Sequence, residues 1–308
     1  MSVLTSQEVL ASIAQGDSLQ DAELSCIDLK EQNLDNTIFA RAYLKKANLE
    51  SASCFKSDFS LAELMFANLQ KINLQKANLE QTKFNNARLQ NANLQEVQAK
   101  CANFYEAQVD KLNGILGSFQ KSNWYQAKGT QLCLSSSNLS KANLSKANLR
   151  KSNFSSADMN SANLSYGSFQ DSLWENCNLS NAVLIYSSFA NGNFQKATLV
   201  DADLRYSDLS SADISNAELI EANLESALLK NTNLSNTSLL SANLENAQFI
   251  GTNLENTDLS DANLENTIWQ DVDLTKCIVR DSVFTKAQGL TDEQKKWLQK
   301  NGAINVEF

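Results

Sequence analysis

The stretch 142–151 reads ANLSKANLRK, which is one five-residue pattern written twice. Counting in fives from Leu144 in both directions gives 54 consecutive units, with centres from Leu19 to Phe284. Fifty of these centres are Leu, Phe, Ile, Val, Met or Trp; the exceptions are Cys54, Ala99, Gly114 and Gly129. A small residue stands two positions before each centre, and the position directly before it is mostly Asn or Asp. A repeat this long decides the organisation of the chain.

The pattern resembles that of the pentapeptide-repeat family, A-(D/N)-L-X-X, over about residues 17–288. The resemblance implies an all-β solenoid, a right-handed quadrilateral parallel β-helix with four pentapeptides per turn and about 13 coils. Period five alone does not give this geometry, because it matches neither an α-helix nor an alternating strand.

In such a coil the centre and the small residue before it point inward, and the other three positions point outward, where they can be polar and variable. Coils about 4.8 Å apart would give a rod roughly 65 Å long. Proline would remove a backbone donor from the ladders between coils, and the chain contains none.

We therefore expect one repeat domain between two short helical segments. Residues 1–16 are expected to hold an N-terminal capping helix, 17–288 the β-helix, and 289–308 a C-terminal capping helix and tail. Thr291 and Gln294 form a capping-box sequence, and Gly16 follows an apolar stripe that contains Val9. A docking helix for a partner remains the alternative to the N-terminal cap, and the resemblance offers dimer formation as the alternative role of the C-terminal segment.

Residues 97–136 are the least regular part of the repeat. Large residues occupy small inner positions at Val97, Leu112 and Leu132, and three centres, Ala99, Gly114 and Gly129, are undersized. Two interpretations remain open. Large and small side chains compensate in volume within a distorted coil, or 110–117 or 126–136 leaves the coil as a loop.

The residue inventory argues against an enzyme. The chain has no His, which excludes Ser-His and Cys-His catalysis and histidine metal sites. It has no Gly-rich phosphate loop and no C-x-x-C pair. Cys54, Cys177 and Cys277 fall on inward positions and are interpreted as core residues. We expect no catalytic, cofactor-binding or metal site.

If residues 20 apart stack, all six tyrosines lie on one face of the coil. Tyr166, Tyr186 and Tyr206 are consecutive in this register; Tyr105 and Tyr125 form a second pair, and Tyr43 lies further toward the N-terminus. Met65, Phe66 and Ile185 share the face. Exposed aromatic stripes often mark binding surfaces, whereas stacking that only stabilises coil pairing is the structural alternative.

Charge divides the chain unevenly. Residues 1–155 carry 17 Lys+Arg and 14 Asp+Glu, and residues 156–308 carry 9 and 21. Glu225, Glu245 and Glu265 form one stack on the tyrosine face, and Glu221, Asp261 and Asp281 lie beside them. An acidic stripe can attract a basic partner surface, or it can simply keep the protein soluble.

These features favour a non-enzymatic, rigid scaffold that binds an unidentified protein partner. Two alternatives come from the resemblance: a DNA mimic that binds DNA gyrase or topoisomerase, and a secreted bacterial effector. Direct nucleic-acid binding is disfavoured by the net charge of −9. We expect no membrane span, a cytoplasmic location, and a monomer or a homodimer formed through the C-terminal segment.

Overall fold

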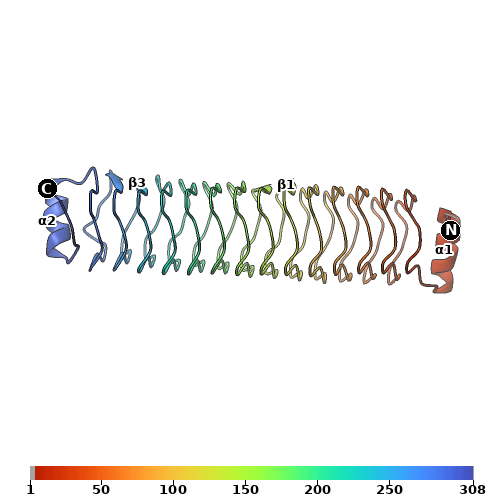
Figure 1. The fold of residues 1–308 in the computed structure, drawn as a ribbon. Coiled ribbons are helices and arrows are strands. Elements are labelled where there is room, and N and C mark those ends of the chain that lie inside the picture. The colour runs from red at the N-terminus through yellow and green to blue at the C-terminus, as the bar shows by residue number, and fades with distance from the viewer. Residues whose placement is uncertain (1–3, 308) are drawn as a thin grey trace. The chain divides into compact units, whose positions relative to one another are not determined.

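The computed structural model describes residues 4–307, which fall into two compact units. The first ends at Ala157 and contains helix α1 (Ser6–Gln15) and strands β1 (Lys128–Thr130) and β2 (Asn148–Arg150). The second begins at Asp158 and contains strands β3 (Gln248–Ile250) and β4 (Ile268–Gln270) and helix α2 (Asp292–Lys300). Within each unit the chain winds through coils that lie side by side (Figure 1).

Backbone pairing recurs at every fourth repeat in both units. In the first unit Asn48 pairs in parallel with Asn68, which in turn pairs with Arg88. In the second unit Asn223 pairs in the same way with Asn243. Because the partners lie four repeats apart, four repeats make one coil, and each unit is a parallel β-helix.

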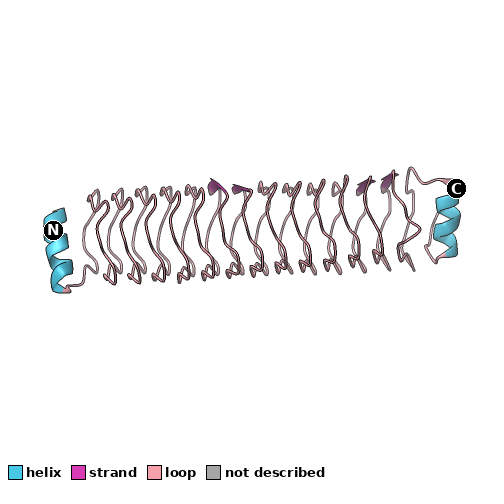
Figure 2. Ribbon diagram, turned by 180° about the vertical axis from the view of Figure 1, so that it is seen from behind, coloured by secondary structure: helices cyan, strands magenta, loops and turns pink. Residues whose placement is uncertain are grey.

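Most of the paired segments are too short to count as strands. β1 pairs with β2 and β3 pairs with β4, both in parallel. The other pairings are single-residue bridges, so most of the chain is drawn as loops and turns (Figure 2). The expected backbone hydrogen bonds between coils are present, and they are grouped in short segments because a turn interrupts the extended backbone in every repeat.

The centre residue and the small residue before it form the core. Leu224 and Ala222, for example, have no exposed surface. Aromatic centres stack on those of the next coil, as Phe249 does on Trp269 with ring centroids 4.2 Å apart. This stacking fills the lumen at the close-packed density that protein interiors require.

A tight turn follows the centre residue of nearly every repeat. After Leu44, the amide of Ala47 donates to the Leu44 carbonyl at 3.0 Å, and Lys46 has a φ of 59°. A positive φ at this place is typical of type II turns and usually calls for Gly. Lys46 is held there because its amide donates to the carbonyl of Met65 in the next coil at 2.9 Å. The neighbouring coil thus fixes a conformation that the side chain disfavours.

The Asn or Asp before each centre has a definite structural role. The amide two positions later makes no ladder bond, and the side chain accepts from it: Asn48 Oδ1 from Glu50 at 3.3 Å, and Asn243 Oδ1 from Glu245 at 3.2 Å. Such Asx contacts satisfy a backbone donor locally. This outward position is therefore polar, as expected, and its side chain also supports the backbone of the turn.

These Asn side chains also bond to one another along the coil axis. Asn263 Nδ2 donates to Asn243 Oδ1 at 3.1 Å, and Asn243 Nδ2 donates to Asn223 Oδ1 at 3.2 Å. Aspartate has no donor and can only receive, as Asp28 does from Asn48 at 2.9 Å. Asn therefore continues an amide ladder, whereas Asp can only begin one.

The stretch 97–136 keeps the four-repeat register. Gln98 pairs with Ser118, and Asn113 pairs with Cys133. Neither 110–117 nor 126–136 leaves the stack as a loop.

Large side chains compensate for the undersized centres inside this stretch. Phe119 and Trp124 are fully buried with ring centroids 5.5 Å apart. A Cβ atom on Gly114 would lie 2.6 Å from Leu134 Cδ2, and one on Gly129 would lie 2.7 Å from the backbone of Val109. The large rings and packed neighbours therefore occupy the space that the two glycines leave.

A distorted coil lies at 271–276, outside the stretch 97–136 that is least regular in sequence. In the preceding coil the Asn236 amide donates to the Glu255 carbonyl. The equivalent Asn256 amide donates to the Lys276 carbonyl, which is one residue further along the chain than the regular pattern requires. The residues that would form the following coil belong to α2. Gln294 in that helix donates to the Val272 carbonyl at 2.9 Å.

Both helices carry a complete capping box. Thr5 and Glu8 begin α1, in which Val9 is fully buried and the Ser6 hydroxyl donates to the Asp28 carbonyl at 2.7 Å. Thr291 and Gln294 begin α2, in which Leu298 is fully buried. Beyond α2, Ile304 pairs in parallel with Val283. No helix among residues 4–307 has the length and apolar character needed to cross a membrane.

Candidate protein-binding surface

Tyr166, Tyr186 and Tyr206 form a continuous stack on the outside of the second unit, here called the tyrosine row. Ring centroids are 5.3 Å apart in the first pair and 4.6 Å in the second, with interplanar angles of 12° and 4°. The side chains are 56%, 51% and 43% exposed. Each is the second residue after a centre, here called the second turn position, and has the left-handed backbone conformation, with φ of 60°, 56° and 59°. The fixed backbone therefore presents three nearly parallel rings that are all partly open to solvent.

Glu225, Glu245 and Glu265, here called the acidic row, continue from the tyrosine row in the next three coils. Each directly follows a centre residue, here called the first turn position, and lies in the same turn of the coil as the tyrosines. Their backbone amides are held by Asn223, Asn243 and Asn263 at 3.1, 3.2 and 3.1 Å. The Asn ladder therefore sets the position of each glutamate on the surface.

The two rows meet at one side-chain contact. The Tyr206 hydroxyl donates to Glu225 Oε1 at 3.3 Å. The Glu225 carboxylate raises the pKa of Tyr206 above its ordinary value, and stacked Tyr186 adds to the effect. Within residues 4–307, none of the three glutamates forms an ion pair. The acidic row therefore presents carboxylates that are not held in ion pairs within the described chain.

Arg205 lies beside the tyrosine row and is already paired. It makes a fork with Asp203, through Nε at 2.8 Å and Nη2 at 2.7 Å. The bond from Arg205 holds the pKa of the Asp203 carboxyl below its ordinary value. This pair is neutral as a unit, so the negative charge of the surface comes from the acidic row.

The first unit holds the other tyrosines in different environments. Tyr105 and Tyr125 occupy the first turn position, stack with centroids 5.8 Å apart and are half-buried. Lys146 Nζ lies 5.5 Å from the Tyr125 ring centroid, within cation–π range. Tyr43 lies in the bridging position and pairs with Glu63. The six tyrosines thus occupy three different positions of the repeat. The prediction that they share one face did not distinguish these positions.

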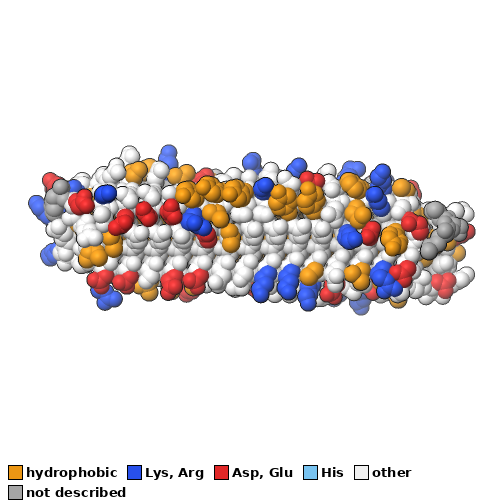
Figure 3. Space-filling view, viewed as in Figure 1, with side chains coloured by type: hydrophobic (Ala, Val, Ile, Leu, Met, Phe, Trp, Pro, Cys, Tyr) orange, Lys and Arg blue, Asp and Glu red, His pale blue; other side chains and the backbone are white. Residues whose placement is uncertain are grey.

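Figure 3 shows hydrophobic side chains in a row on the second unit, followed by a row of acidic ones. The surface is made of side chains that stand out from a regular wall. Among residues 4–307, no group of three or more His, Cys, Asp or Glu could hold a metal ion. Burial raises the pKa of the Cys54 and Cys177 thiols, which keeps both protonated and unreactive.

Comparison with protein families agrees with the coil geometry. The model described as pentapeptide repeats matches residues 22–60, 52–81, 62–98, 72–108, 134–165, 168–199, 177–216, 217–256 and 257–288. The chain belongs to the pentapeptide-repeat family. The fold of this family, a right-handed quadrilateral β-helix, agrees with the four turns in each coil. The longest unmatched stretch between residues 22 and 288, 109–133, falls within the stretch with undersized centres.

Three solved pentapeptide-repeat structures illustrate the relationship. HetL from the cyanobacterium Nostoc sp. strain PCC 7120, a protein involved in heterocyst differentiation regulation, is 25% identical, with a TM-score of 0.43, over 81% of this chain and 96% of HetL. QnrB1, a plasmid-mediated fluoroquinolone resistance protein, is 16% identical, with a TM-score of 0.35, over 55% and 95%. Rfr23 from the cyanobacterium Cyanothece 51142 is 22% identical, with a TM-score of 0.26, over 46% and 90%. The curated proteins contain no significant match.

Proposed function

We propose that this pentapeptide-repeat protein is a non-enzymatic scaffold that binds a protein partner through the tyrosine row and the acidic row of its second unit. The observation that supports this most strongly is the exposure of three stacked tyrosines beside three glutamates that form no ion pair in the described chain. A stack that served only to stabilise the coils would use the contacts between ring faces, and these contacts leave the exposed surface of the rings available to a partner.

The rigidity of the tyrosine row favours binding. Association orders side chains, and immobilising a flexible one costs about 0.5–1.5 kcal/mol. The three rings are stacked on each other, and Tyr206 is also bonded to Glu225. Binding a partner would therefore cost these side chains little further conformational entropy. Tyrosine offers a large apolar body and a polar hydroxyl, which is why it is enriched in interfaces.

The acidic row gives the surface a preference among partners. Three like charges on successive coils repel one another, and solvent keeps that cost small. A basic partner would relieve the repulsion, and its approach would be steered by the field of the row. The proposed partner is therefore a protein with a Lys- or Arg-rich surface that also carries apolar groups.

Affinity capture from an extract of the native host tests the proposal. The bait proteins are the wild type, the variant Tyr186→Glu/Tyr206→Glu, and the variant Glu225→Gln/Glu245→Gln/Glu265→Gln. We expect mass spectrometry to identify a partner held by the wild type and lost from both variants, while thermal unfolding stays close to wild type. A matched control changes Tyr105 and Tyr125 to Glu in the first unit.

Two outcomes would contradict the proposal. If the tyrosine variant loses thermal stability together with binding, the row is a structural stack. If all variants capture the same proteins as the wild type, this surface is not the binding site.

The helices form part of the same proposal. We propose that α1 and α2 cover the ends of the coils, where unpaired backbone would otherwise invite strand addition from other molecules. Val9 and Leu298, each fully buried, support this role. With the ends covered, partners would be selected by the outer corners.

DNA mimicry at a topoisomerase is the second candidate function. In its favour, Glu221 and Asp261 place further carboxylates across the Asn ladder from the acidic row, with Ser241 in the coil between them. Against it, residues 1–155 carry more basic than acidic side chains, unlike a phosphate backbone. A supercoiling assay with DNA gyrase and micromolar protein decides between the two. Inhibition or protection from a quinolone would favour mimicry, and no effect would remove it.

A further inference from the structure

A second exposed surface lies in the first unit, on two neighbouring coils. Tyr43, Leu61 and Phe66 are 46%, 45% and 52% exposed, and Met65 is partly exposed. Tyr43 pairs with Glu63, so it lies directly beside the segment that carries the other three. Large apolar side chains gathered on one wall commonly mark an interaction site. Together with Lys45 and Lys46 they are here called the apolar–basic patch.

The free charge of this patch is positive. Lys45 and Lys46 are exposed and stand one coil before Met65 and Phe66. Within the described residues neither lysine forms an ion pair.

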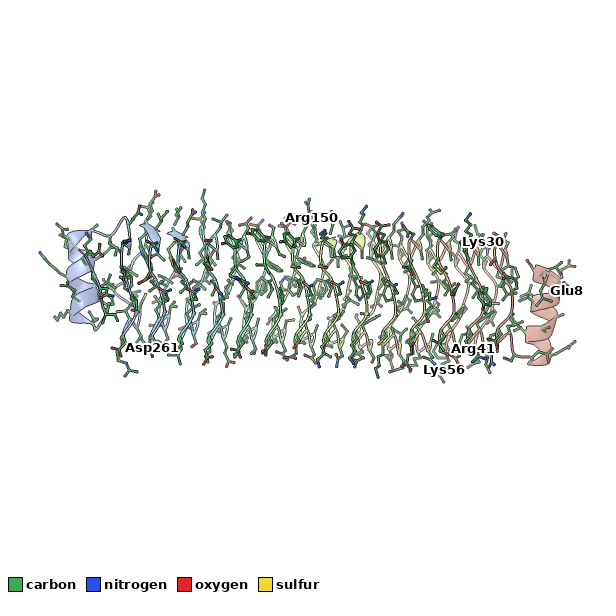
Figure 4. All side chains as sticks on the ribbon, viewed as in Figure 1. Glu8, Lys30, Arg41, Lys56, Arg150 and Asp261 are labelled. Carbon is green, nitrogen blue, oxygen red and sulfur yellow. The ribbon has the colours of Figure 1, made fainter. Side chains whose placement is uncertain are left out.

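Two other charges near the patch are neutralised locally, whereas Glu23, which pairs with Tyr43, forms no ion pair among the described residues. Glu63 Oε1 lies 2.8 Å from Lys83 Nζ. Arg41, which stands on the outside of its coil (Figure 4), lies 2.7 Å from Asp21. A partner would therefore meet two unpaired lysines and one unpaired carboxylate, that of Glu23, so the free charge of the patch is positive on balance.

The patch matches the tyrosine and acidic rows in kind and in order. Along the first unit, from N- to C-terminus, the lysines come first and the apolar side chains follow in the next coil. Along the second unit the tyrosines come first and the glutamates follow, beginning with Glu225 beside Tyr206. If two such surfaces meet with opposite chain directions, lysine faces glutamate and Phe66 faces tyrosine. In both units, residues four repeats apart lie in neighbouring coils, so the spacing between successive side chains along the two surfaces is the same.

We infer that the partner of the tyrosine and acidic rows is the apolar–basic patch of a second copy of this chain. This inference rests on the proposed function of those rows. Each copy carries one surface of each kind. Copies that exchange both contacts form a closed two-fold dimer, whereas a single contact leaves complementary surfaces free for further copies.

Sedimentation velocity of purified full-length protein tests the inference. We expect the wild type to form a dimer at micromolar concentration. At about 0.1 M salt the Debye length is about 10 Å, and at about 1 M it is about 3 Å. Dimer formation should therefore weaken as salt rises, although the apolar contacts persist.

Charge reversal gives a sharper test. One variant carries Lys45→Glu/Lys46→Glu, and the other carries Glu225→Lys/Glu245→Lys/Glu265→Lys. Each alone should associate at least about tenfold more weakly than the wild type, because like charges then face each other. An equal mixture of the two should dimerise again, because one contact is rebuilt with reversed signs and the other is native.

A matched control reverses two lysines at another corner of the first unit, Lys111→Glu/Lys151→Glu. Both lysines have the left-handed turn conformation of Lys46, with φ of 53° and 56°. This variant should dimerise like the wild type. Circular dichroism of every variant checks that the fold is retained.

Several results would overturn the inference. A wild type that stays monomeric at high concentration and low salt would do so, and so would two monomeric variants whose mixture stays monomeric. Binding of the monomeric wild type to phosphatidylserine vesicles, lost in Lys45→Glu/Lys46→Glu, would assign the patch to a membrane surface instead. If self-association is absent and capture of another protein still depends on Tyr186 and Tyr206, the inference fails and the proposed function stands.

Discussion

Removing one amide from an Asn ladder should cost more than removing an equivalent amide outside a ladder. Asn243→Ala is the test within the second unit, and Asn193→Ala is its control. Asn243 accepts from the Glu245 amide at 3.2 Å and from Asn263 Nδ2 at 3.1 Å, and it donates to Asn223 Oδ1 at 3.2 Å. Asn193 accepts from the Gln195 amide at 3.0 Å and has no ladder bond among the described contacts.

The expected magnitudes follow from the number of bonds. A net contribution of about 0.5–1.5 kcal/mol per hydrogen bond gives about 2–3 kcal/mol for Asn243→Ala and about 1 kcal/mol for Asn193→Ala. Asn243→Asp keeps both acceptor roles and loses the donor to Asn223. Its cost in the free energy of unfolding should lie between those of the two alanine variants.

Urea unfolding followed by circular dichroism measures the overall effect. Because solenoids unfold through neighbouring repeats, hydrogen exchange of the Glu245 amide provides a local reading. Faster exchange there, with little change a coil away, would locate the loss at the ladder. Equal destabilisation by Asn243→Ala and Asn193→Ala would refute the reasoning, because the side-chain bonds between coils would then contribute nothing.

Three further changes have defined outcomes. Glu225→Gln removes the main cause that raises the pKa of Tyr206, so absorbance titration at alkaline pH should show Tyr206 ionising at lower pH than in the wild type; an unchanged titration curve would contradict the contact. Gly129→Ala places a Cβ atom 2.7 Å from the backbone of Val109, so calorimetry should show destabilisation of about 1–3 kcal/mol from overpacking. Leu244→Ala leaves a cavity at a fully buried centre and should lower the free energy of unfolding by about 2–5 kcal/mol, whereas a loss below about 1 kcal/mol would mean that the coil collapses to fill it.

The sequence predicts the core well because the core follows one rule. Apolar centres and small residues recur in fives without a slip, and the pairing of Asn48 with Asn68 shows the same phase in space. The chain belongs to the family that this pattern resembles. Side-chain volume was harder to judge, because whether Gly114 and Gly129 mark a loop depends on neighbours in the adjacent coils, four repeats away along the chain.

The surface was less predictable, because its chemistry depends on contacts between coils. The sequence places Tyr206 and Glu225 on one face but does not indicate that the hydroxyl reaches the carboxylate. It shows Asn before most centres without showing which backbone amide needs the side chain. It also gives no sign that Lys46 adopts a left-handed turn, because the reason lies in the carbonyl of Met65 in the next coil. The binding roles of the tyrosine and acidic rows stay predictions.

The four-repeat register also restricts how this chain can change length. Deleting a single repeat would keep every later centre in the core, yet it would turn every later surface position by a quarter of the coil. A deletion between Tyr206 and Glu225 would leave the interior intact and carry the glutamates to a different side from the tyrosines. Gains and losses of whole coils preserve both the interior and the alignment of outward side chains. Selection for a binding surface should therefore favour insertions and deletions of four repeats at a time, whereas selection for folding alone would accept any whole number of repeats.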